Sequence, residues 1–278
     1  MAIVTFWSEC KKEVAQTSAA IAVGTQMAME HNYKILLIST YDKGELGDAF
    51  MKQTKARKGL AGMFAGTNKV NIDSGVQGLA KNVTSGKLTP NIITNYTKII
   101  LKDRFEVLDW YDLKDMSFAD IYRTYPDIIL NASMYYDMVL VDLNRDIDNE
   151  ITKKILEISN IIVYGINQKN SVLNAYEESR MNGFLKDKKN IIPYLGRYDK
   201  FSKYNSKNIA RYLKIGKDMN YMSFNTMFAE SCDEGTVVDL FFNLKTIKSE
   251  DKNVDFLNEV RKITDSIIYK VEELKLKI

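Results

Sequence analysis

Residues 2–40 read AIVTFWSECKKEVAQTSAAIAVGTQMAMEHNYKILLIST, and this stretch decides the fold. Residues 2–6 are a short apolar run with three consecutive β-branched side chains, which is typical of a strand. Residues 17–30 are rich in alanine and methionine and lack proline, so they predict a helix. Residues 34–40 are a second apolar run, of the kind found in strands that are buried in parallel sheets. The chain therefore opens with a βαβ unit.

The segment between the first strand and the helix is where a nucleotide-binding chain carries its phosphate loop. Residues 11–18 read KKEVAQTS. A phosphate loop needs glycines, so that consecutive backbone N–H groups can turn inward, a lysine for the outer phosphates and a hydroxyl side chain for magnesium. Only the hydroxyl groups of Thr17 and Ser18 meet these requirements. The position of the loop is kept and most of its chemistry is missing.

This strand, loop and helix resemble the ParA/MinD group of P-loop ATPases, whose loop reads Lys-Gly-Gly-x-Gly-Lys-Thr. Lys11 matches the first, group-defining lysine, and Thr17 matches the magnesium-binding threonine. Gln16 replaces the phosphate lysine. The places of the three glycines are taken by Lys12, Glu13 and Ala15. The resemblance therefore implies the fold of these ATPases and argues against their activity.

Later segments resemble the same group in the same order. A buried strand that ends at Asp142 resembles the strand that carries the Walker B aspartate. The second strand of these ATPases ends in aspartates that organise the attacking water, whereas here Asp42 stands one place further along. The strand 190–195 leads into Gly196 and Arg197, where the group commonly has asparagine followed by a basic residue. The likeness covers almost the whole chain.

The resemblance implies a set of site residues. Asp42 and Asp142 are vestigial catalytic candidates, and Thr17 with Asp142 would hold magnesium. If a nucleotide binds, its contacts come from Lys11, Gln16, Thr17, Ser18 and Arg197. The cofactor prediction is either none or ATP with magnesium. Thr17 can equally start a helix, Asp142 can cap a strand, and Lys11 can be an ordinary exposed loop lysine.

Within the group, three segments resemble the TadZ/CpaE-like branch, whose members help to place pilus-assembly or secretion machinery at a cell pole. The residues that carry this likeness are 78–91, 95–98 and 196–202. Irregular phosphate loops are frequent in this branch, so the altered loop agrees with the assignment.

Composition agrees with one domain over residues 1–278. Strands that alternate with helices predict an α/β fold with a doubly wound, mainly parallel sheet flanked by helices. The two cysteines have no metal-ligand spacing, and no segment resembles a secretory signal or a membrane span, so we expect a cytoplasmic protein. Residues 54–75 are expected to be mobile. Helices are expected over 76–83, 90–101, 117–133 with a break at Pro126, and 171–183, and strands over 105–110, 161–166, 191–195 and 220–225.

The C-terminal segment, about 252–276, has apolar residues three or four positions apart and predicts an amphipathic helix. Core packing is the favoured interpretation of this stripe, and a membrane-surface or partner-docking helix is the alternative. The polar face mixes glutamate and lysine, which counts against adsorption to a membrane.

The net charge is only +3, so the whole chain gives no strong electrostatic case for DNA binding. Two local clusters are basic: Lys52, Lys55, Arg57 and Lys58, and then Arg197, Lys200, Lys203, Lys207 and Arg211 interleaved with Tyr198, Phe201 and Tyr204. Basic and aromatic interleaving is typical of surfaces that bind single-stranded nucleic acid, although a charge run is more often a solvated face.

The sequence therefore favours a catalytically degenerate ParA/MinD-like homodimer that acts as a scaffold or positioning factor. Its partner would belong to a cell-envelope, pilus or secretion assembly, and its placement at a membrane or pole would come through that partner. A second hypothesis is a slowly hydrolysing ATP switch that uses Lys11, Thr17, Asp42 and Asp142. A third is a non-specific nucleic-acid-binding partition protein.

Overall fold

The computed structural model describes residues 1–10, 14–41, 45–51, 75–109, 116–144, 149–246 and 252–276. Its strands are β1 (Ala2–Trp7), β2 (Ile35–Ser39), β3 (Lys98–Leu101), β4 (Phe105–Leu108), β5 (Met138–Asp142), β6 (Ile161–Ile166), β7 (Ile191–Tyr198) and β8 (Asn220–Ser223). Its α-helices are α1 (Gln16–Glu30), α2 (Glu45–Asp48), α3 (Val76–Thr84), α4 (Phe118–Tyr122), α5 (Tyr125–Ser133), α6 (Glu150–Ile158), α7 (Asn170–Met181), α8 (Ser206–Tyr212), α9 (Thr226–Glu234), α10 (Val237–Leu244) and α11 (Lys252–Lys275). A 3-10 helix, η2, spans Pro90–Asn95.

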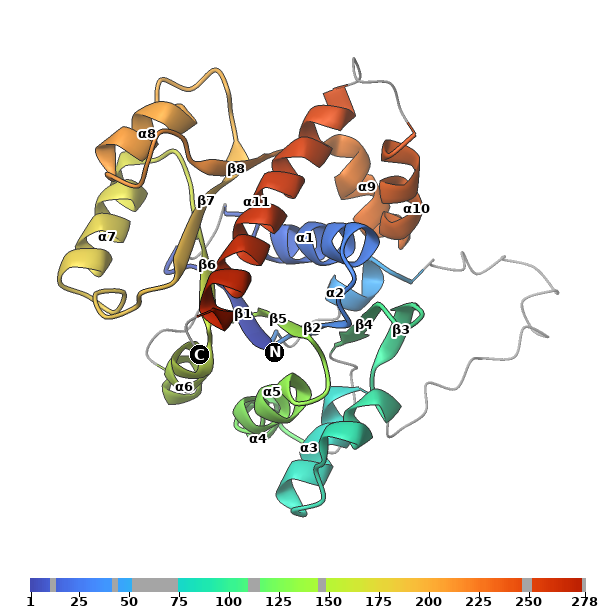
Figure 1. Cartoon of the computed structure of the whole chain (residues 1–278). Coiled ribbons are helices and arrows are strands. Elements are labelled where there is room, and N and C mark those ends of the chain that lie inside the picture. Colours follow the sequence, from blue (N-terminus) through green and yellow to red (C-terminus); the bar gives the residue numbers. More distant parts are fainter. Residues whose placement is uncertain are drawn as a thin grey trace.

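The strands form one sheet in the order β3-β4-β2-β5-β1-β6-β7-β8, with helices on both of its faces (Figure 1). Neighbouring strands pair in parallel except β3 and β4, which pair in antiparallel fashion. The chain order moves from β1 outward to one edge and then returns past β1 to the other edge. The doubly wound, mainly parallel α/β fold expected from the sequence is confirmed.

Two apolar cores lie on the two faces of this sheet. Side chains alternate along each strand, so in β1 Val4 and Phe6 enter one core while Ile3 and Trp7 enter the other. The first core is closed by α1, α2, α9, α10 and α11, and the second by α3 to α8. All of β1, β2 and β5 is buried, which explains why their sequences are continuous apolar runs.

Helix α1 lies inside the molecule, between the sheet and helices α10 and α11 (Figure 1). Alanine and glycine allow this close approach, because a Cβ atom added at Gly24 would lie 3.2 Å from the ring of Phe105. Even the polar Thr25 and Gln26 are buried. The helix is therefore apolar on nearly every side and not amphipathic.

The prediction of a helix over residues 90–101 is wrong. The structure has η2 there, followed by a turn and then β3. Thr89 does precede the helical turn, but its side chain makes no capping hydrogen bond. The β-branched pair in β3, Ile99 and Ile100, favours the antiparallel ladder with β4 that replaces the second half of the expected helix.

The helix expected over residues 117–133 is divided into α4 and α5. The break falls at Arg123 and Thr124, before Pro126 and not at it. Pro126 lies in the first turn of α5, where its missing N–H group removes no helical hydrogen bond. The strand expected over 105–110 ends at Leu108, and the stretch expected to be mobile, 54–75, lies almost wholly outside the described residues.

Helix α11 packs its apolar stripe into the first core, against α1 and the β8 edge. The buried members of the stripe are Phe256, Leu257, Val260, Ile263, Ile267 and Val271. Within the part of the chain that the structure describes, no helix combines the length and the apolarity that crossing a bilayer requires.

We predict that truncation of the α11 stripe destabilises the fold. Ile267 is fully buried, so Ile267→Ala should lower the free energy of unfolding by about 2–5 kcal/mol, because it removes apolar contacts and leaves a cavity. Tyr269 is 74% exposed on the same helix, so Tyr269→Ala should change the free energy of unfolding by no more than about 0.5 kcal/mol. Urea unfolding followed by circular dichroism measures both values. Equal losses would contradict the assignment of the stripe to the core.

Candidate functional site

The candidate site lies where α1 begins, at the carboxyl ends of the parallel strands, which is where ligands bind in open α/β sheets. Three of the predicted residues meet there. The Thr17 hydroxyl donates a hydrogen bond to Oδ2 of Asp142 at 2.7 Å, and the Gln16 amide donates one to Oδ1 at 2.7 Å. Asp142 is the last residue of β5 and is fully buried. Both oxygens of its carboxylate are therefore held by α1.

Gln16 points into the protein. Its amide nitrogen also donates to the backbone oxygen of Leu143 at 2.8 Å, and the residue is only 1% exposed. Its own amide oxygen has no hydrogen-bond partner among the described residues. The side chain that the resemblance aligns with the phosphate lysine is thus neutral and is hydrogen-bonded to Asp142.

The carboxyl end of β2 is tied to the same residue through the backbone. The Thr40 N–H donates to the backbone oxygen of Asp142 at 3.0 Å, and the Asn144 N–H donates to the Thr40 hydroxyl at 2.7 Å. Tyr125 reaches this corner from α5 and donates to the backbone oxygen of Ser39 at 2.8 Å. Burial, followed by the nearby charge of Asp109, raises the pKa of Tyr125 well above its usual value, so its hydroxyl stays a donor.

The backbone before α1 keeps one feature of a phosphate loop. Ala15 has φ 48° and ψ 43°, the left-handed conformation that glycine adopts without cost and other residues adopt at roughly 1–2 kcal/mol. Ala15 occupies a glycine position of the ParA/MinD pattern. The chain therefore makes a left-handed turn directly before α1 at a residue that is not glycine.

The path of the backbone at Val14 explains why residue 196 in β7 is a glycine. Its backbone crosses the end of that strand so closely that a Cβ atom at Gly196 would lie 1.9 Å from the Val14 oxygen. The same oxygen accepts a hydrogen bond from the Tyr194 hydroxyl at 3.0 Å. The sequence suggested only that Gly196 lacks a side chain for a nucleotide base. The structure shows a packing reason for this residue.

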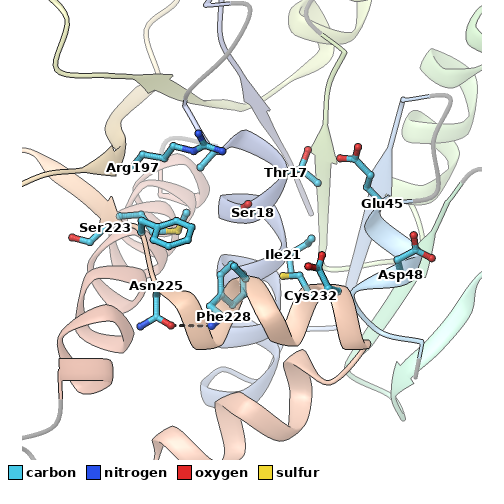
Figure 2. Close-up of a pocket in the computed structure, with 15 residues that line it drawn as sticks. Thr17, Ser18, Ile21, Glu45, Asp48, Arg197, Ser223, Asn225, Phe228 and Cys232 are labelled. Carbon is cyan, nitrogen blue, oxygen red and sulfur yellow. Dashed lines mark hydrogen bonds between the residues drawn. The ribbon is translucent and has the colours of Figure 1, made fainter. Parts of the chain in front are cut away.

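A cavity of about 400 Å³ opens beside the start of α1. Figure 2 shows Arg197 and Ser223 approaching it from β7 and β8, and Glu45 and Asp48 approaching from the α2 side. Thr17 and Ser18 also line it, with Phe224, Asn225, Phe228, Cys232 and Asp233 from the β8–α9 region. The predicted nucleotide contacts Thr17, Ser18 and Arg197 therefore share one cavity, whereas Gln16 does not line it.

The electrostatics of this cavity do not favour a polyphosphate. Three carboxylates line it, those of Glu45, Asp48 and Asp233, against one cation among the described lining residues, Arg197. Burial, with a smaller contribution from Asp233, raises the pKa of the Cys232 thiol to about 12. That thiol stays protonated at neutral pH and adds no nucleophile to the site.

These residues fit magnesium–ATP poorly. The Thr17 hydroxyl and the Asp142 carboxylate are oxygen ligands of the kind that magnesium prefers. Both oxygens of the carboxylate, however, already accept hydrogen bonds, one from Thr17 and one from Gln16. No lysine among the described residues lines the cavity. Two candidates, Lys11 and Asp42, lie outside the described residues, as do Lys12, Glu13 and the basic cluster at 52–58.

Comparison with known proteins gives the fold. No family model matches the sequence, and no curated protein matches it. Among solved structures, a ParA family ATPase from Chlorobium tepidum TLS is 15% identical, with 95% of this chain and 96% of that chain covered and a TM-score of 0.65. The septum site-determining protein MinD from Pyrococcus horikoshii OT3, complexed with Mg-ADP, is 15% identical, with 96% and 97% covered and a TM-score of 0.67.

A third neighbour is a putative plasmid partition protein from Borrelia burgdorferi B31 bound to AMPPNP. It is 15% identical, with 97% of this chain and 99% of that chain covered and a TM-score of 0.62. Likeness over nearly the full length at such low identity shows that the chain has the fold of ParA/MinD-family ATPases.

We predict that the crossing of Val14 over β7 makes Gly196 sensitive to substitution. Gly196→Ala forces a Cβ atom against the Val14 backbone and should cost about 1–3 kcal/mol of unfolding free energy or more. Gly165→Ala is the matched control, because its nearest atoms, at 3.0–3.1 Å, belong to the side chains of Tyr194 and Val14. Urea unfolding of both variants should show the larger loss at Gly196, and a larger loss at Gly165 would contradict the described path of the backbone.

Proposed function

We propose that this chain is a ParA/MinD-type protein that acts as a dimeric scaffold or positioning factor without ATP turnover. The observation that carries the proposal is the inward hydrogen bond from Gln16 to Asp142. Phosphoryl transfer is catalysed almost entirely by positioning and by positive charge around the transferred group. A neutral amide that is already bound to the Walker B position supplies neither.

The charges of the α1 cavity support the same proposal. With three carboxylates and one guanidinium among its described lining residues, the cavity would repel a triphosphate unless other cations neutralised it. Phe224, which lines the cavity, is 67% exposed, and Met227, at the start of α9, is 43% exposed. Exposed apolar groups of this kind suit contact with another protein surface, which supports a role in assembly.

The finer assignment is a homodimer that places pilus or secretion machinery at a cell pole, bound to the membrane or pole only through a partner. It rests on the resemblance of residues 78–91, 95–98 and 196–202 to the TadZ/CpaE-like branch. One structural neighbour, the MinD cell division protein of Aquifex aeolicus, forms a complex with MinC. Binding to another protein is thus compatible with this fold.

An ATP-binding, slowly hydrolysing switch is the second candidate. Ala15 in the left-handed conformation and the contact between Thr17 and Asp142 favour it.

A nucleic-acid-binding partition protein is the third candidate. Arg197, Lys200, Lys203, Lys207 and Arg211 are all exposed, and Phe201, 86% exposed, lies 5.4 Å from the Lys200 ammonium group.

The first test is calorimetric titration of the protein with magnesium and AMPPNP, together with its mass in solution. We expect no heat of binding and a dimer mass that nucleotide does not change. Micromolar binding that converts monomer to dimer, and that is lost in Thr17→Ala, would establish the switch and overturn the scaffold. Retention on DNA that falls with salt and survives Asp142→Ala would support the third candidate.

A second prediction concerns Gln16→Lys, which restores the phosphate lysine. We expect no measurable ATP hydrolysis, because the new ammonium group would begin beside the buried carboxylate of Asp142 and pair with it. Positions 12 and 13 also still lack glycine. Release of phosphate from ATP measures the outcome, with Gln16→Met as the uncharged control. Vigorous hydrolysis by Gln16→Lys alone would contradict the account of the site.

A further inference from the structure

A second cavity lies at the opposite ends of the strands that border the first. Ile191 and Asn220, the first residues of β7 and β8, line a cavity of about 500 Å³. Arg197 and Ser223, near the carboxyl ends of the same strands, line the α1 cavity instead. The two cavities are therefore separated by the length of β7 and β8, and a ligand in one does not touch the other.

Four cations from three segments converge on this second cavity, which we call the basic cavity. Arg180 comes from the last turn of α7, Lys188 and Lys189 come from the connection to β7, and Lys214 follows α8. Lys214 has φ 54°, a left-handed position after a helix that glycine usually fills. Asp218 is the one carboxylate among the described lining residues, so the lining carries three positive charges in excess (four minus one).

These cations are not neutralised within the described part of the chain. None of the four lies within 4.0 Å of a carboxylate oxygen there. The Lys188 ammonium donates to the backbone oxygen of Leu156 at 3.5 Å and lies 5.1 Å from the Phe184 ring. The Arg180 guanidinium lies 6.0 Å from the Tyr176 ring. These carbonyl and ring contacts place no carboxylate beside Lys188 or Arg180.

We propose that the basic cavity binds a small multivalent anion that carries phosphate groups. Excess positive charge in a concave site concentrates anions, and lysine and arginine are the common phosphate binders. The volume lies in the range of small-molecule sites, roughly 300–1,000 Å³. A single nucleic-acid strand suits the cavity less well, because stacking needs an exposed aromatic ring. Tyr176, the aromatic residue among its described lining, is only 1% exposed.

The test is calorimetric titration with inorganic pyrophosphate in the absence of magnesium. Lys188→Gln/Lys214→Gln should bind at least about tenfold more weakly than the wild-type protein, because two charge-assisted contacts are lost. Lys200→Gln/Lys203→Gln removes the same charge from the exposed β7–α8 segment and should bind like wild type. Thr17→Ala should also bind like wild type, since it alters only the α1 cavity.

Five results would overturn the proposal. The first two are that pyrophosphate does not bind the wild-type protein, or that it binds the wild-type protein and Lys188→Gln/Lys214→Gln equally. Equal weakening in Lys200→Gln/Lys203→Gln would mean that general surface charge attracts the anion, and loss in Thr17→Ala would place pyrophosphate at the phosphate loop. Oligo-dT that displaces pyrophosphate and loses affinity in the same double variant would make the ligand a nucleic acid. Circular dichroism establishes that each variant is folded.

Discussion

The buried carboxylate of Asp142 is the group on which the site depends. An ionised carboxylate without partners costs several kcal/mol when it is removed from water. Here both oxygens are satisfied by the first two residues of α1, and the backbone oxygen of the same residue holds the end of β2. The start of α1 and the ends of two central strands are therefore fixed by one side chain and its peptide group. Any ligand that needs Asp142 has to compete with these internal hydrogen bonds.

The start of α1 combines a left-handed backbone turn and oxygen donors with little positive charge among the described residues that line its cavity. Ala15 is in the left-handed conformation, and the Thr17 hydroxyl donates a hydrogen bond to the aspartate that ends β5. Gln16 is neutral, and the described lining of the adjoining cavity carries three carboxylates and one guanidinium. Four cations line the basic cavity at the opposite ends of β7 and β8.

The sequence predicted the fold well because buried parallel strands leave a strong local signal. The runs that became β1, β2, β5 and β6 are almost wholly apolar, and they alternate along the chain with helical segments, which predicts a parallel, doubly wound sheet. Local signals failed where a distant contact decided the outcome. Residues 98–101 became a strand because β4 offered an antiparallel edge, and Gly196 is required by a backbone 182 positions earlier in the chain, at Val14. The pairing of Gln16 with Asp142 was likewise invisible, because glutamine at a lysine position indicates only a loss of charge and not the new partner.

The margins of the sheet restrict how copies of this protein can join. Both edge strands, β3 and β8, are only four residues long, and α11 packs along β8. Short or covered edges present few free backbone groups, so addition of a further strand from another molecule is disfavoured. Self-association then has to come from complementary side chains on helices and loops. Such contacts are reversible and can be adjusted by single substitutions, which is a property that a positioning factor can use.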